Sequence, residues 1–134
     1  MPLHYSPKNI PRVIIIQKLY GKLFNKKENL SFPKHRFKKF IKDVVNGTIE
    51  RDEVINEEIK KHLGSDLKLA NIDKVFQVVI KSAIFELLYK PKTSAKIIIK
   101  EYLNASNYFI NDSQTKYLNA LLDKISKKIR TSNE

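Results

Sequence analysis

The apolar residues of this chain recur at every third or fourth position along most of its length, and this spacing limits the fold more than any other feature. Residues three and four apart share one face of an α-helix, whereas a half-buried strand alternates apolar and polar residues. The clearest stripe spans residues 76–88 and consists of Phe76, Val79, Ile80, Ala83, Ile84, Leu87 and Leu88. No segment has the alternation of a strand, and the sequence therefore predicts an all-α fold.

Prolines and glycines set the expected boundaries of the first three helices. Pro11 opens the first helix and Pro33 the second, because proline is favoured in the first turn. Gly47 ends the second helix, and Thr48 caps a third that closes at Gly64. The β-branched residues after Pro11 are also compatible with a strand, but the helical spacing continues beyond them.

Capping residues place the remaining helices. A short helical turn is expected over 65–72, ahead of the long apolar stripe. Thr93 or Ser94 caps the following helix, and Asn111 with Gln114 has the pattern of a capping box at the start of the last one. The sequence therefore predicts a compact bundle of about seven helices joined by short connections.

The chain offers none of the usual constellations for catalysis or metal binding. Its 134 residues suit one domain, residues 1–134, and the absence of cysteine excludes disulfide scaffolds, zinc ribbons and thiol catalysis. The three histidines lie on different elements without acidic residues at metal-ligand spacing, and no glycine-rich phosphate loop or nucleophile with a base is present. We therefore expect no enzyme, no metal and no cofactor.

The charge of the chain points to a polyanionic partner. Lys and Arg number 26 against 14 Asp and Glu, a net charge of +12, which favours nucleic acid first and a membrane surface second. No apolar stretch approaches the roughly 18 residues of a membrane span and no signal pattern opens the chain, so we expect a cytoplasmic protein. The basic run at 34–39 is either a solvated helix face or an extension of an RNA-binding track.

Four blocks of the chain resemble the NusB family of bacterial transcription antitermination factors. Residues 75–89, VFQVVIKSAIFELLY, are similar to the family's iLRlAlyEL helix, with Glu86 at the family glutamate. The block KTSAKIIIKEYLNASNYF resembles vPykvaInEaielAkkf, and TKYLNALLDKI resembles hkFVNGvLdki. Near the start, PRVIIIQKLYG resembles RecAvQaLY. The blocks occur in family order, which makes their combination more specific than any one of them.

The resemblance implies a fold of two packed helical subdomains and a role in RNA binding. The implied partners are the single-stranded boxA element of ribosomal RNA leaders, the ribosomal protein NusE and the RNA polymerase antitermination complex; a homodimer stays open. The implied RNA-binding residues lie on or before the first helix and at the start of the last: Lys8, Arg12, Lys18, Tyr20, Asp112, Lys116 and Tyr117. Lys74 and Phe76 are implied to contact NusE.

The basic arm that often opens family members is reduced here to Lys8 and Arg12, so we expect weak RNA binding by the protein alone and tighter binding with NusE. Tyr117 either stacks on a base or lies at the edge of the core, and Tyr20 fits the apolar stripe of its helix. The alternatives are a protein-interaction scaffold and a DNA-binding regulator. We find no helix-turn-helix pair with a polar recognition helix, which disfavours the latter.

Overall fold

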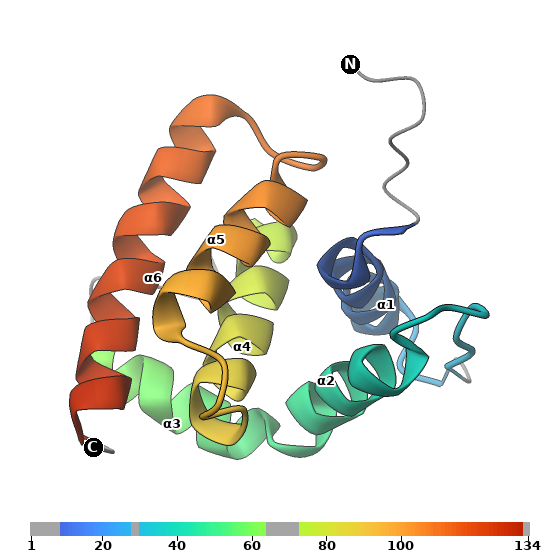
Figure 1. The fold of residues 1–134 in the computed structure, drawn as a ribbon, viewed down its shortest axis with the longest axis horizontal. Helices are drawn as coiled ribbons and strands as arrows, with labels where there is room; N and C mark the ends of the chain where they lie inside the picture. The colour runs from blue at the N-terminus through green and yellow to red at the C-terminus, as the bar shows by residue number, and fades with distance from the viewer. Residues whose placement is uncertain (1–8, 28–29, 64–72, 133–134) are drawn as a thin grey trace.

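The computed structural model describes residues 9–27, 30–63 and 73–132, and in these ranges it contains helices and no strand (Figure 1). The all-α prediction is thereby confirmed. The turn expected over 65–72 lies outside the described residues. The described helices are α1 (Pro11–Phe24), α2 (Lys38–Glu50), α3 (Asp52–Leu63), α4 (Lys74–Tyr89), α5 (Ala95–Ser106) and α6 (Asp112–Ser132).

Helix α4 forms the centre of the fold and packs against all five other helices. Eleven of its 16 residues are buried, as expected for a helix that is apolar on nearly every side. Helices α1 and α2 lie on one side of α4, and α6 lies on the other (Figure 1). This arrangement matches the expected layout in two packed parts, and one hydrophobic cluster runs through both.

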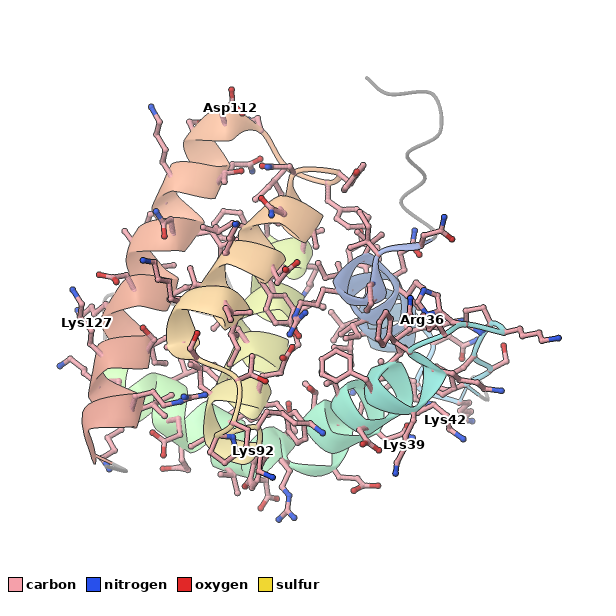
Figure 2. All side chains as sticks on the ribbon, viewed as in Figure 1. Arg36, Lys39, Lys42, Lys92, Asp112 and Lys127 are labelled. Carbon is pink, nitrogen blue, oxygen red and sulfur yellow. The ribbon has the colours of Figure 1, made fainter. Side chains whose placement is uncertain are left out.

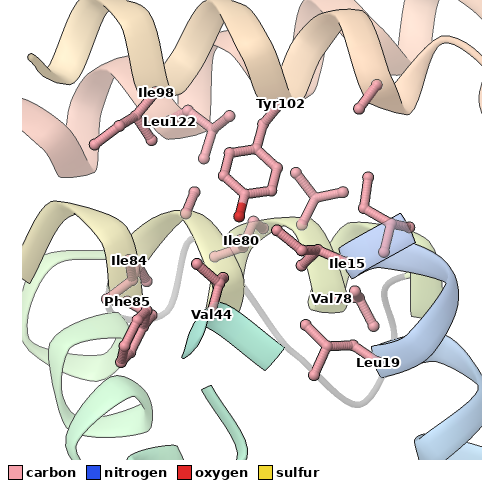
Figure 3. Packing of buried hydrophobic residues seen from close by; sticks show 14 of the residues in the cluster. Ile15, Leu19, Val44, Val78, Ile80, Ile84, Phe85, Ile98, Tyr102 and Leu122 are labelled. Atoms are coloured by element: carbon pink, nitrogen blue, oxygen red, sulfur yellow. The ribbon is translucent and has the colours of Figure 1, made fainter. Parts of the chain in front are cut away.

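The core contains the residues that the apolar stripes predicted. The apolar spacing along the helices predicts eight core residues, of which six are buried: Phe76, Ile80, Ile84, Leu87, Leu118 and Leu122. The other two, Phe40 and Leu103, are partly buried and pack against the core. Figure 3 shows Tyr102 reaching from α5 towards Ile80 and Ile15. Tyr102 is among the largest side chains that are fully enclosed, so this ring joins the packing of α1, α4 and α5.

The starts of α4, α5 and α6 are fixed by side-chain caps. Oγ of Ser94 accepts a hydrogen bond from the N–H of Ile97 at 3.2 Å, which selects Ser94 from the two expected caps. The capping box is also confirmed, since Oδ1 of Asn111 accepts from the N–H of Gln114 at 2.9 Å and Oε1 of Gln114 accepts from the N–H of Asn111 at 3.0 Å. Asp73 caps α4.

The predicted boundaries of the second helix were wrong. Helix α2 begins at Lys38 instead of Pro33 and continues through Gly47 to Glu50, so Thr48 lies inside it and does not cap α3. The glycine itself is explained by the packing between α2 and α4, because a Cβ atom added at Gly47 would clash with the ring of Phe85. Glycine is therefore used here for a close approach between two helices, and not to end one.

Candidate nucleic-acid interface

Arg12 joins α1 to the buried side of α4. Its Nη2 lies 2.6 Å from Oε1 of Glu86 and its Nε donates to Oε2 at 3.1 Å, a two-point contact. Glu86 is fully buried and the side chain of Arg12 is only 13% exposed. Burial by itself lowers the pKa of Arg12, but the hydrogen bond and charge of Glu86 outweigh it and raise the pKa. Arg12 could take its expected RNA role only by leaving Glu86.

Aromatic rings enclose the same guanidinium. Its central carbon lies 5.0 Å from the ring centroid of Phe40 and 5.4 Å from that of Tyr102. Burial raises the pKa of Tyr102 well above its usual value of 10.0, and the charge of Glu86 adds to this shift. The surroundings of Arg12 are therefore those of a structural contact between helices.

The other candidates on α1 are more accessible. Tyr20 is 38% exposed and Lys18 is partly exposed, whereas Lys8 lies outside the described residues. Tyr20 borders a hollow of about 400 Å³ between α1, the first turn of α4 and the connector before α6. The residues that line this hollow are Ile16, Gln17, Tyr20, Gly21, Val75 and Phe109.

The structure brings Phe76 and Tyr117 together, although the sequence assigned them to different partners. Their rings are stacked with centroids 5.8 Å apart and planes inclined by 25°. Phe76 is 5% exposed and Tyr117 is 46% exposed, so Phe76 supports a ring that is still open to solvent. Together with Asp73, Ser113 and Gln114 they line a second hollow, of about 310 Å³. Tyr117 thus combines packing at the edge of the core with an accessible ring.

These hollows flank the first turn of α4, because Val75 lines one and Phe76 lines the other. We call this surface the aromatic face and define it as Tyr20, Val75, Phe76, Phe109 and Tyr117. Three lining rings are exposed by more than a third, those of Tyr20, Phe109 and Tyr117. Such rings can stack on unpaired bases.

The charged candidates border the aromatic face at two helix starts. Lys74 is the first residue of α4 and is exposed, as are Asp112 and Lys116 in the first turns of α6. Asp112 marks this end of α6 in Figure 2, at the opposite end from Lys127. Exposed lysines beside aromatic rings provide contacts for the phosphates of a single strand.

Phe109, like Val75, is a residue of this surface that is not among the site residues predicted from the sequence. It is 37% exposed, in the connector between α5 and α6. The available signal was an aromatic residue within the polar segment NYFIND, at the end of a block that resembles the family.

Comparison with known proteins shows which family the chain belongs to. The sequence model of the NusB family matches residues 10–127. The chain belongs to the NusB family. Members of this family are transcription antitermination factors, and curated relatives carry the name transcription antitermination protein NusB.

The curated NusB relatives match about two thirds of the chain. The protein from Lysinibacillus sphaericus is 32% identical over 89 residues, which are 66% of this chain and 69% of that protein. The protein from Rickettsia massiliae is 33% identical over 92 residues, or 69% of this chain and 56% of the relative.

A solved structure of T. maritima NusB shows that the fold is shared. It superposes with a TM-score of 0.76 at 21% identity, covering 91% of this chain and 92% of that one. Within the described ranges, no helix has the length and apolar character needed to cross a membrane.

Proposed function

We propose that this NusB-family chain is a transcription antitermination factor that acts in the cytoplasm by binding RNA, without a catalytic step. Its RNA is boxA-type single strand from ribosomal RNA leaders, and it assembles with NusE and RNA polymerase. The observation that carries the proposal is the stack of Tyr117 on Phe76, which holds an exposed ring at the starts of two helices. Family membership supports the choice of RNA as the polyanion.

The proposed RNA contacts divide into stacking and phosphate contacts. Tyr117 and Tyr20 offer rings for bases, and Lys116 and Lys18 offer ammonium groups for phosphates. Asp112 accepts hydrogen bonds from base or ribose groups at the start of α6. Lys8 adds a phosphate contact ahead of α1. Arg12 is not part of this surface, because its guanidinium is held by Glu86.

The proposed contact with NusE uses the exposed side of α4's first turn. Lys74 is exposed there, whereas Phe76 is almost fully covered, partly by Tyr117. Phe76 therefore acts by supporting Tyr117, and Lys74 is available to a protein partner. Because this turn also borders the RNA-binding rings, NusE and RNA would occupy adjacent surfaces, and each should raise the affinity for the other by the same factor.

The test is a titration of fluorescent boxA-like and scrambled RNA, each with and without NusE. We expect weak binding to the protein alone, tighter binding with NusE, and a preference for the boxA-like sequence. Equal affinity for both sequences under all conditions would instead indicate a protein-interaction scaffold with incidental nucleic-acid affinity.

A pair of matched variants then tests the site. Tyr117→Leu should weaken RNA binding by about 1–3 kcal/mol, the usual contribution of one stacked base. Tyr89→Leu is the control, because Tyr89 is 38% exposed and packs on a buried ring, Phe85, at 5.1 Å, but lies at the other end of α4. Equal RNA affinities of the two variants would contradict the proposed site.

A further inference from the structure

Within the described residues, the segment that leads into α2 carries a dense run of positive charge without neutralising partners. Residues 30–42 contain no acidic residue, and in the described part of the chain none of their five Lys and Arg side chains forms an ion pair. These side chains are all exposed: Lys34, Arg36, Lys38, Lys39 and Lys42. The next residue, Asp43, pairs with Lys90 at 3.5 Å. This charge is therefore available to an external anion.

An exposed aromatic ring lies among these cations. Phe37 is 47% exposed, more than any other aromatic side chain that the structure describes. The guanidinium carbon of Arg36 lies 5.4 Å from its ring centroid, and the ring of His35 lies 6.0 Å away. Cations interleaved with an open ring are typical of surfaces that bind single-stranded nucleic acid, where phosphates and bases alternate.

The segment is fastened to the start of α1 through His35. The backbone N–H of Phe37 donates to Nδ1 of His35 at 2.9 Å, so the imidazole proton is on Nε2 and is donated to the carbonyl oxygen of Asn9 at 3.2 Å. Asn9 lies two residues before the first residue of α1. The cations are therefore held beside the N-terminal end of α1, the helix that also carries Tyr20 of the aromatic face.

The location differs from that of the aromatic face. Arg36, Lys39 and Lys42 gather at one edge of the molecule in Figure 2, well away from Asp112 at the start of α6. Helix α1 connects the two surfaces, and its 14 residues span about 21 Å at 1.5 Å per residue. A single strand of RNA that leaves the aromatic face along α1 would meet these cations.

We infer that Lys34, Arg36, Phe37, Lys38 and Lys39, which we call the α2 basic patch, bind the phosphodiester backbone of single-stranded RNA as a second contact region. This inference rests on the proposed function. The lysines and Arg36 contact phosphates, and Phe37 provides a stacking surface for one base. The patch supplies positive charge next to α1, where Arg12 is engaged by Glu86. Its contribution to affinity is sensitive to salt and independent of RNA sequence.

The test compares two double variants that remove equal charge. Lys38→Gln with Lys39→Gln changes the patch, and Lys92→Gln with Lys96→Gln changes exposed lysines elsewhere. Binding to boxA-like and scrambled RNA is titrated over a series of salt concentrations. The slope of log affinity against log salt is negative, and the patch variant should reduce its magnitude by about 1.4, which is 0.7 for each of two phosphates. The reduction should be equal for both RNAs. The control should leave the slope nearly unchanged.

Phe37→Leu provides a second measurement at the same patch. It should weaken RNA binding by about 5- to 150-fold if the ring stacks on a base. Because Phe37 and the two lysines are exposed, thermal unfolding of these variants should match that of the parent protein. A loss of affinity can then be assigned to binding.

The outcomes separate this inference from the proposed function. Suppose that the parent protein prefers boxA-like RNA and that Tyr117→Leu weakens RNA binding. If the patch variant then behaves like its control, the patch is not an RNA contact and the aromatic face stands. If the parent protein binds neither RNA, both proposals are wrong.

Sedimentation with anionic phospholipid vesicles tests a membrane surface as the other possible polyanion. Vesicle binding that the patch variant loses, with RNA binding intact, would overturn the inference in favour of a membrane surface.

Discussion

Removal of the Glu86 carboxylate should destabilise the protein much more than removal of an exposed charge. Glu86 is fully buried and contacts the guanidinium of Arg12 at two points, so Glu86→Ala leaves a largely buried cation without its paired carboxylate. Breaking a buried ion pair from one side costs about 3–5 kcal/mol. This is a large part of the roughly 5–15 kcal/mol that stabilises an ordinary domain. Urea unfolding followed by far-ultraviolet circular dichroism would measure the loss.

Removal of both charges together should cost much less than removal of either alone. In Arg12→Met with Glu86→Met, neither charge has to be desolvated, and apolar replacements of buried ion pairs are often neutral or stabilising. The methionine at position 12 would also pack between the rings of Phe40 and Tyr102, which now flank the guanidinium. A double-mutant cycle over the parent protein, Arg12→Met, Glu86→Met and the double variant gives the coupling free energy between the two side chains.

Arg51→Ala is the control for removal of an exposed charge and is compared with Glu86→Ala and Arg12→Ala. Arg51 is exposed and lies 4.9 Å from the ring centroid of Tyr89, a contact of about 0.5–1 kcal/mol. A cost of Glu86→Ala no greater than this would refute the role of the pair in holding α1 on α4. Arg12→Ala should change RNA affinity only in proportion to the folded fraction. A larger loss would show that Arg12 contacts RNA directly.

Two further predictions concern packing and pH. Gly47→Ala should destabilise the protein by about 1–3 kcal/mol because its Cβ would meet Phe85. Gly21→Ala should stabilise α1 by up to about 1 kcal/mol, because its Cβ meets nothing within 4 Å. Equal urea midpoints for the two variants would contradict the α2–α4 packing. Because the pKa of Tyr102 is raised above 10.0 in the folded state, the unfolded chain releases this proton first, so the stability it contributes is complete below pH 10 and declines above it. Tyr102→Phe should lack this part of the alkaline decline, and identical alkaline stability profiles would refute it.

The helices and their caps could be predicted because their signals are local. The spacing of apolar residues gave α4 and its core face, and the Asn111–Gln114 box depends only on residues three apart. The prediction that Gly47 ends the second helix was wrong for the opposite reason. Glycine is a local signal for a helix end, but the use of Gly47 is decided by Phe85 on another helix.

The candidate site could be predicted only in part, since it depends on contacts between distant segments. Arg12 and Glu86 are 74 positions apart, and nothing near either residue reveals that they pair. In the same way, Tyr117 was recognised as a candidate ring, but its support by Phe76 required the packing of α6 beside α4. The sequence supplied the candidate residues, whereas the fold decides which of them are accessible.

The stack of Tyr117 on Phe76 affects the conformational entropy that the protein would lose on binding RNA. Phe76 lies in the first turn of α4 and Tyr117 in the second turn of α6, two helices that pack against each other, and Phe76 already limits the positions of the Tyr117 ring. Ordering one residue of a flexible loop costs about 1–2 kcal/mol of backbone conformational entropy. A ring fixed in advance on helical backbone avoids most of this cost. The loss of freedom on binding would then fall mainly on the RNA, whose single strand has to be ordered along the protein.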